Sequence, residues 1–308
     1  MNVAETIKKN TRKHLENGGL FYGQCVSAVG WIGGTVPEMT EEEGIIELPT
    51  SDSSNAAIVC GSALAGRRPI YAIRYQGFMA YNAASLLNFA AKSQEMWETP
   101  CPVFVRGIGM EGSIGPVATG MHHSMVMRMP GFIVASPMTP SEWEQVWDYY
   151  LENQQPVFCS EHRTSFTIDY EIENIIYKNM HPKSKKRTKA TIFSIGAARP
   201  ESIKAYEVLK EKNINVNVIN LVWLKPLQIS DEAISLLKES EFGIVIDSDF
   251  HICGASEHIA NLLMIKTSKP VYALGLEDRT SGFAAHCDNL TPNAIKIANA
   301  VEFEDFVI

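Results

Sequence analysis

Apolar runs of strand length alternate along the chain with segments of helical periodicity. In the first half the strand-like runs are 70–75, 102–106, 132–135 and 157–160. Apolar positions at helical spacing predict helices at 3–17, 53–64, 79–97 and 141–151. The first of these should end at Gly18-Gly19, because glycine favours a helix C-terminus. Strands that alternate with helices predict a parallel sheet with helices on both faces.

The alternation breaks between residues 172 and 189, where Asn, Lys, Pro and Ser predominate. Such a change of composition is typical of an interdomain connection. The pattern then resumes, with strands expected at 190–195, 216–221, 243–247 and 270–274 and helices at 200–212, 231–238 and 255–264. We therefore predict an α/β fold with two doubly wound domains, residues 1–171 and 190–308, joined by a linker at 172–189.

Composition is that of a soluble globular protein: 45% of the 308 residues are hydrophobic and 20% are charged. The net charge of -8 argues against a nucleic-acid binder. The one basic run, from Lys183 to Lys189, is interpreted as a solvated linker in preference to a binding patch. The N-terminus does not show the pattern of a signal peptide, and no apolar run approaches the roughly 20 residues of a membrane span. We expect a cytoplasmic protein.

The six cysteines are scattered, with no CxxC pair and no metal-like spacing to the eight histidines. Several lie in apolar runs, which favours buried thiols in a reducing compartment. No metal site is expected in this chain.

Asp52 is the first candidate for chemistry, because it comes directly before a small-residue helix that begins with Ser53-Ser54. In open parallel sheets, ligands bind beyond the carboxyl ends of strands, where helix N-termini present N–H groups. The strand that follows leads to Tyr75 and Phe78, and an aromatic ring suits a flat heterocycle. Taken alone, Asp52 is more typical of an ordinary helix N-cap than of a site residue.

His122 and His123 form a second candidate. Adjacent histidines on a short helix point in different directions, so only one can easily face a site. That one can act as an acid or as a hydrogen-bond donor to a reacting oxygen. A structural role remains open for either.

Several segments occur together in an order that is informative. They are Leu48-Pro-Thr-Ser-Asp52-Ser, Gly61-Ser-Ala-Leu-Ala-Gly-Arg-Arg-Pro-Ile, Asn88-Phe-Ala-Ala-Lys92, Val105-Arg-Gly107, His123-Ser124, Pro130-Gly-Phe-Ile-Val-Ala-Ser-Pro137, Asn220-Leu-Val-Trp-Leu-Lys-Pro-Leu-Gln and Gly254-Ala-Ser-Glu. In order and spacing they resemble the beta subunit of the thiamin-diphosphate-dependent decarboxylating component of 2-oxo acid dehydrogenase complexes. That family has the transketolase-like architecture, with a pyrimidine-binding domain followed by a transketolase C-terminal-like domain.

The resemblance implies roles for individual residues. Asp52 occupies the position of a glutamate that hydrogen-bonds N1' of the aminopyrimidine of thiamin diphosphate. Phe78 matches the aromatic residue that stacks on the pyrimidine. His123 matches a histidine on the substrate side that assists acyl transfer to lipoamide. The implied activity is decarboxylation of a 2-oxo acid.

The resemblance also implies partners. In that family a separate alpha subunit holds the diphosphate and Mg²⁺ through Gly-Asp-Gly and a later Asn, and this chain contains no Gly-Asp-Gly. The implied assembly is a tetramer of two alpha and two beta subunits with beta-beta contacts, which passes its acyl group to a lipoyl acyltransferase.

Three residues depart from the family pattern. Asp52 is one methylene shorter than the expected glutamate, and a shift of about 1 Å at a catalytic contact can cost on the order of 100-fold in rate. Gln24 stands on the cofactor side, where the family has a glutamate, and an amide cannot ionise. Arg74 introduces a cation that would meet an anionic substrate or neutralise Asp52. These departures leave two alternatives open, a transketolase-like carboligase subunit and a non-catalytic subunit.

Overall fold

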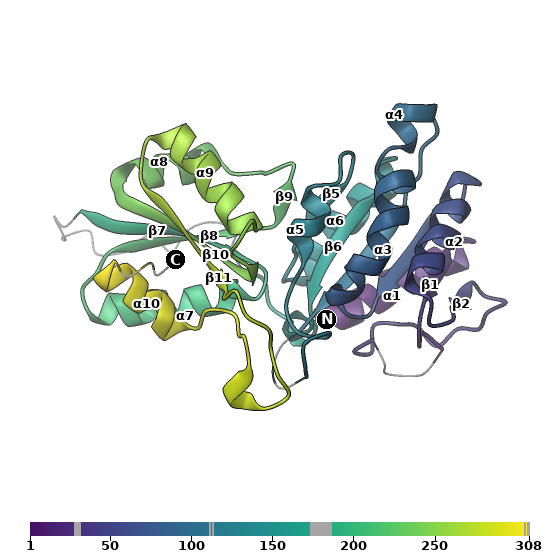
Figure 1. Cartoon of the computed structure of the whole chain (residues 1–308), viewed down its shortest axis with the longest axis horizontal. Helices are drawn as coiled ribbons and strands as arrows, with labels where there is room; N and C mark the ends of the chain where they lie inside the picture. The colour runs from purple at the N-terminus through teal and green to yellow at the C-terminus, as the bar shows by residue number, and fades with distance from the viewer. Residues whose placement is uncertain (28–31, 111, 113, 173–186, 305, 307–308) are drawn as a thin grey trace. The chain divides into compact units, whose positions relative to one another are not determined.

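The computed structural model describes residues 1–27, 32–110, 112, 114–172, 187–304 and 306. They form two compact units (Figure 1). The first comprises residues 1–110 and 117–171, and the second comprises 111–116 and 172–308. Gly115 belongs with the second unit because a Cβ at this glycine would lie 2.4 Å from the ring of Phe283. Most of the expected linker, residues 173–186, lies outside the described residues.

The first unit is built on a parallel sheet. Its strands are β1 (Leu20–Gly23), β2 (Ile45–Glu47), β3 (Pro69–Ile73), β4 (Phe104–Gly109), β5 (Ile133–Ala135) and β6 (Val157–His162). Within this unit they lie in the order β2-β1-β3-β4-β6-β5, and every pair of neighbours is parallel. Strands β3, β4, β5 and β6 are buried along their whole length. This explains the unbroken apolar runs of β3 and β5, whereas β4 and β6 also bury charged residues, among them Arg106 and Glu161.

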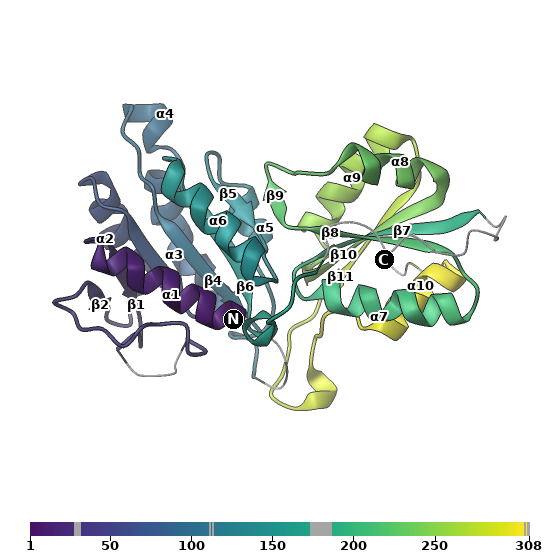
Figure 2. The ribbon, with the colours of Figure 1, turned by 180° about the vertical axis from the view of Figure 1, so that it is seen from behind.

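Helices cover both faces of this sheet. They are α1 (Val3–Glu16), α2 (Asp52–Leu64), α3 (Met79–Ser85), α4 (Ser93–Trp97), α5 (His123–Met127) and α6 (Pro140–Glu152), with 3₁₀ turns η1 (Gln76–Phe78) and η3 (Arg163–Thr167) and a π-helical segment η2 (Leu86–Ala90). Helices α1 and α6 lie on one face, and α2 and α3 lie on the other (Figures 1 and 2). Capping boxes start two of them, Asn2 with Glu5 at α1 and Thr139 with Glu142 at α6.

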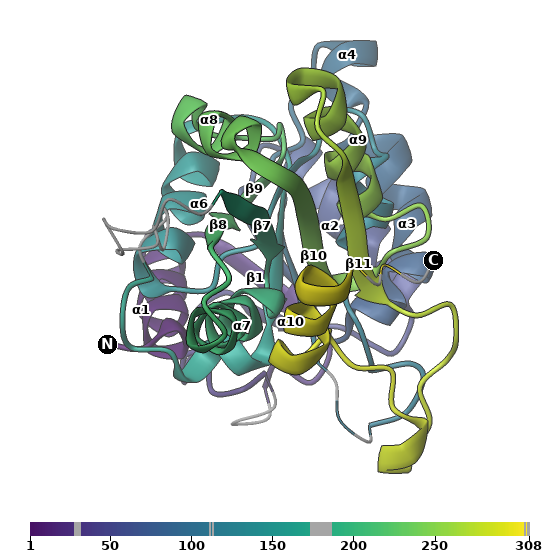
Figure 3. The ribbon, with the colours of Figure 1, turned by 90° about the vertical axis from the view of Figure 1, so that its left-hand side faces the viewer.

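The second unit has its own parallel sheet, in the order β11-β10-β7-β8. Its strands are β7 (Thr188–Ile195), β8 (Val216–Leu221), β10 (Ser240–Phe250) and β11 (Val271–Leu276), and a short strand β9 (Trp223–Lys225) follows β8. Helices α7 (Ala198–Glu211) and α10 (Ala294–Phe303) cover one face, and α8 (Asp231–Glu239) and α9 (Ala255–Thr267) cover the other (Figure 3). A 3₁₀ turn, η4 (Ala285–Cys287), lies between β11 and α10.

The core beneath α7 and α10 shows the two-residue period of strands. Ile192 on β7, Val218 on β8 and Ile244 on β10 all belong to it, and each has at least one neighbour at i±2 in the same cluster. Along these strands, alternate side chains therefore point to opposite faces, and both faces are buried. This is the expected doubly wound arrangement, so the predicted fold class is confirmed.

The structure departs from the expected elements in several places. The single helix expected at 79–97 is divided into α3, η2 and α4, because Ala91 N donates to Leu86 O (2.9 Å) as a π turn interrupts the helix. Strands β1, β2 and β9 and helix α10 were not predicted, since the strands have three or four residues and show too little periodicity. Strand β7 begins at Thr188, inside the range expected for the linker. No helix in the described ranges is long and apolar enough to span a bilayer.

A buried ion pair joins two central strands of the first unit. Arg106 on β4 donates from Nε and Nη2 to both carboxylate oxygens of Glu161 on β6, each at 2.8 Å. Trp143 Nε1 donates to the same carboxylate at 3.0 Å, and Thr35 Oγ1 accepts from Arg106 Nη2 at 2.9 Å. Both charged side chains are almost completely buried. Neither charge has access to water, so each depends on the other.

We expect Glu161→Gln to lower the free energy of unfolding by about 3–5 kcal/mol, because it leaves the Arg106 cation buried without a counter-charge. Urea denaturation followed by tryptophan fluorescence measures this change. The matched control is Glu144→Gln, which removes an exposed partner of Lys9 (3.7 Å) in the same unit and should cost at most about 1 kcal/mol. Equal losses in the two variants would contradict the assignment.

Candidate functional site

The four residues proposed from the sequence all follow the carboxyl ends of strands in the first unit. Gln24 comes directly after β1, Asp52 follows β2, Phe78 follows β3 and His123 follows β4. Because these strands are parallel, their carboxyl ends lie at one edge of the sheet. This edge is where open α/β sheets bind ligands.

Asp52 is the first residue of helix α2 and not its N-cap. The N-cap is Ser51, and α2 has no side-chain capping bond. The expectation of an ordinary N-cap at Asp52 is therefore wrong, since the chain turns into the helix one residue earlier. Its half-buried carboxylate accepts a hydrogen bond from Asn82 Nδ2 on Oδ1 at 3.3 Å. Among the described residues, Asn82 is its one hydrogen-bond partner.

Asn82 is held by two further bonds that fix the direction of its amide. Nδ2 also donates to the carbonyl of Phe78 at 2.9 Å, and Oδ1 accepts from the hydroxyl of Tyr71 at 2.7 Å. Burial raises the pKa of Tyr71, and the nearby charge of Asp52 raises it further. Tyr71 therefore stays a donor, and the amide must present its NH₂ group to Asp52.

Phe78 ends the turn η1, and its ring is half-buried at 5.9 Å from the ring of Tyr75. The residue before it, Gly77, approaches the carbonyl of Val117 so closely that a Cβ would lie 2.3 Å from the oxygen. Only glycine fits there. This contact, together with the Asn82 bond to its carbonyl, fixes Phe78 beside Asp52.

His123 is connected to the same turn through a buried amide. Its Nδ1 lies 3.1 Å from the hydroxyl of Ser160 on β6, and the ring is fully buried. Gln76, the first residue of η1, donates from Nε2 to Ser160 Oγ and to the carbonyl of Gly107, each at 2.9 Å. Gln76 Oε1 accepts from the backbone N–H of His122 at 2.7 Å. One 3₁₀ turn therefore positions both Phe78 and the segment that carries His123.

Gln24 has no hydrogen bond to Asp52, Phe78 or His123 in the part of the chain that the structure describes. Near it, Arg74 Nη1 lies 3.1 Å from the sulfur of Cys25, and the guanidinium lies over the Tyr75 ring. Among the described residues, no hydrogen bond or ion pair joins Arg74 to Asp52. No group of three or more His, Cys, Asp or Glu side chains within the described ranges is placed to hold a metal ion.

The sequence analysis missed Tyr71, Asn82 and Gln76. Asn82 did carry a signal, because it is a polar residue on the buried side of a predicted helix, four positions after Phe78. Gln76 carried none, since its partners come from segments far away in the sequence. Tyr71 carried none because it lies within an apolar strand.

Comparison with known proteins places these two units in families. The transketolase pyrimidine-binding domain matches residues 22–167, and the transketolase C-terminal domain matches residues 180–297. Among curated proteins, the pyruvate dehydrogenase E1 component subunit beta of Rickettsia bellii is 23% identical over 84% of this chain and 82% of its own length. The same subunit of Bacillus subtilis is 24% identical over 80% of this chain and 79% of its length.

A further relative is the acetoin:2,6-dichlorophenolindophenol oxidoreductase subunit beta of Bacillus subtilis, 23% identical over 78% of this chain and 72% of its own length. Two solved structures share the fold. A split-gene transketolase, described as an inactive beta4 tetramer, has a TM-score of 0.72 at 15% identity and covers 98% of this chain and 97% of its own. Transketolase from Campylobacter jejuni has a TM-score of 0.69 at 17% identity, over 97% of this chain and 46% of its own.

The two domain matches follow one another along the chain in the order expected from the resemblance, and together they cover most of it. Two of the relatives that match most of the chain carry the names of E1 beta subunits. The chain therefore belongs to the transketolase-like family, as a relative of the beta subunits of 2-oxo acid dehydrogenase E1 components.

Proposed function

We propose that this chain is the beta subunit of a heteromeric thiamin-diphosphate enzyme that decarboxylates a 2-oxo acid and transfers the acyl group. The observation that carries the proposal is the oriented carboxylate of Asp52 next to Phe78, at the ligand-binding edge of a pyrimidine-binding domain. The names of the relatives, pyruvate dehydrogenase and acetoin oxidoreductase subunits, favour this reaction over a transketolase-like carboligation.

The residues present fit the pyrimidine half of the cofactor. Asn82 occupies Oδ1 of Asp52, and Oδ2 accepts no hydrogen bond from the described residues, so that oxygen can accept one from a ring N–H. Phe78 is half-buried and its ring can stack on a flat heterocycle. When bound, the cofactor supplies an electron sink for cleavage of the bond to the carboxylate carbon.

Within this proposal Asp52 acts as the acceptor that selects and holds a protonated ring nitrogen. The Asn82 amide fixes the plane of the carboxylate, and Tyr71 fixes the amide. Asp52 lies in the first turn of α2, where a helix N-terminus accommodates an acidic side chain.

His123 is proposed to donate a proton or a hydrogen bond to an oxygen of the reacting group. Its ring is fixed by Ser160, which Gln76 orients in turn. Such positioned donors are effective when they need no reorganisation during the reaction. Gln24 is proposed to line the cofactor side without taking part in proton transfer.

The remainder of the site is assigned to an alpha subunit that holds the diphosphate and Mg²⁺, because this sequence contains no Gly-Asp-Gly. We propose a tetramer of two alpha and two beta subunits, acting with a lipoyl acyltransferase in the cytoplasm. In this assignment residues 1–171 are the pyrimidine-binding domain, 172–189 the linker and 190–308 the C-terminal domain.

We expect the purified chain alone to bind thiamin diphosphate weakly and to lack decarboxylase activity, since it holds only the pyrimidine half. Co-expression with an alpha chain that carries Gly-Asp-Gly should produce a complex with tight binding. Isothermal titration calorimetry on the chain and on the complex, with native mass measurement of the stoichiometry, tests both statements. Full decarboxylase activity in the isolated chain would refute the proposal.

In the reconstituted complex, Asp52→Asn should lower kcat by about 100-fold or more, because an amide cannot serve as the charged acceptor. The matched control is Asp148→Asn on α6, an exposed carboxylate on the other face of the sheet, which should leave kcat unchanged. Turnover with a 2-oxo acid and lipoamide provides the measurement. Unchanged turnover in Asp52→Asn would indicate a non-catalytic subunit.

A further inference from the structure

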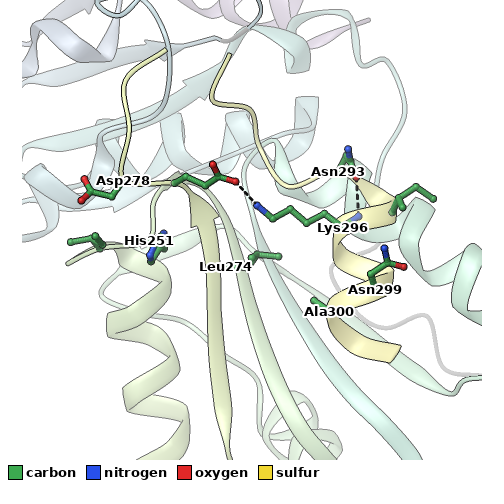
Figure 4. A pocket seen from close by; sticks show the side chains of 10 residues that line it. His251, Leu274, Asp278, Asn293, Lys296, Asn299 and Ala300 are labelled. Atoms are coloured by element: carbon green, nitrogen blue, oxygen red, sulfur yellow. Dashed lines mark hydrogen bonds and ion pairs between the residues drawn. The ribbon is translucent and has the colours of Figure 1, made fainter. Parts of the chain in front are cut away.

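The second unit contains a cavity of about 840 Å³ at the carboxyl ends of strands β10 and β11. Its walls come from the turn after β10 and from helix α10, and Leu274 on β11 lies between them (Figure 4). The volume is within the range of small-molecule sites. Its place at the carboxyl ends of parallel strands is where ligands bind in such sheets. The residues proposed for the thiamin site do not line it.

One wall is held by an unusually close approach of two backbone segments. A Cβ at Gly275 would lie 2.6 Å from the carbonyl oxygen of Asp249, so only glycine allows this packing. It brings both the backbone N–H and Nδ1 of His251 to the carbonyl of Leu276, at 3.2 and 2.9 Å. Because a carbonyl only accepts, Nδ1 must carry the proton. In the neutral ring Nε2 is then an acceptor.

The cationic donor at the cavity and two N–H groups at the start of α10 are already used. Lys296 Nζ lies 3.0 Å from Glu277 (Figure 4), a carboxyl whose pKa is lowered to about 2 by its hydrogen bonds with Arg279 and Lys296. At the N-terminus of α10, the N–H of Ala294 donates to Glu201 (2.9 Å) and the N–H of Lys296 donates to the Asn293 side chain (2.9 Å). An anionic ligand would therefore have to displace existing partners.

Besides the neutral side-chain amides of Asn293 and Asn299, the groups that remain are acceptors and apolar surface. The Asp278 carboxylate has no hydrogen bond or ion pair among the described residues, and His251 Nε2 is a second acceptor. Ile252 and Ile295 are 49% and 57% exposed, and Leu274 adds a third apolar side chain. We propose that this cavity binds a small organic cation, an ammonium or amidinium group carried on an apolar, ring-sized body.

Benzamidine is a suitable probe, with benzoate as the anion of matched shape and benzyl alcohol as the neutral analogue. We expect benzamidine at millimolar concentration to shift the methyl NMR signals of Ile252, Leu274 and Ile295 in the full-length chain. The methyl signals of Ile7 and Ile70, buried in the first unit, should not move. Benzoate and benzyl alcohol should each bind at least about tenfold more weakly than benzamidine, because each lacks the charged donor.

Two variants separate the charge from the apolar surface. Asp278→Asn should weaken benzamidine about tenfold and leave benzyl alcohol unchanged, whereas Ile252→Ser should weaken both. Glu207→Gln, which makes the same change of charge on an exposed residue of α7, should have no effect. The proposal is overturned if benzamidine shifts none of the three methyl groups, if benzoate binds as tightly, or if Asp278→Asn binds benzamidine as well as the unaltered chain does.

Discussion

The buried amide of Gln76 is the contact on which the geometry of the candidate site depends. It lies where strand β3 ends, and its two polar atoms reach β4, β6 and the residue before α5. A buried amide with unpaired atoms would cost about 1–3 kcal/mol for each lost partner, so the three segments are held in one arrangement. The turn that Gln76 begins also carries Phe78. The positions of Phe78 and of His123 are therefore two consequences of one local structure.

Much of the fold was predictable because it rests on periodicity. Strand β8 and the start of α1 match the expected residues, and β6 and α9 differ only in where they end. The errors occur where local pattern and tertiary packing disagree. The segment 79–97 has helical spacing throughout, yet a π turn at Leu86 divides it. Strands such as β2, with three residues, offer too few positions for a two-residue period to be seen.

The residues of the candidate site also fall into those that the sequence predicts and those that depend on tertiary packing. Asp52, Phe78 and His123 were identified from motif order, which records what the family keeps along the chain. The residues that orient them, Asn82 and Gln76, act through contacts between segments that are distant in sequence. No spacing rule predicts such contacts, because they depend on which strand ends lie side by side. The same holds for the shift of the N-cap from Asp52 to Ser51, which depends on the path of the chain into the helix.

The side chain of Asp52, which is shorter than a glutamate, is consistent with the proposal that this chain holds only the pyrimidine half of a cofactor site. At the first position of α2, the charge of Asp52 is stabilised by the helix dipole, by roughly 0.3–1 kcal/mol, and by the Asn82 amide. Its second oxygen can stay hydrated at little cost because the side chain is half-buried and not enclosed. The isolated chain therefore tolerates an oriented carboxyl group without a ligand. A fully enclosed carboxylate would instead have to become protonated, and an acceptor for a ring N–H would be lost before any partner arrived.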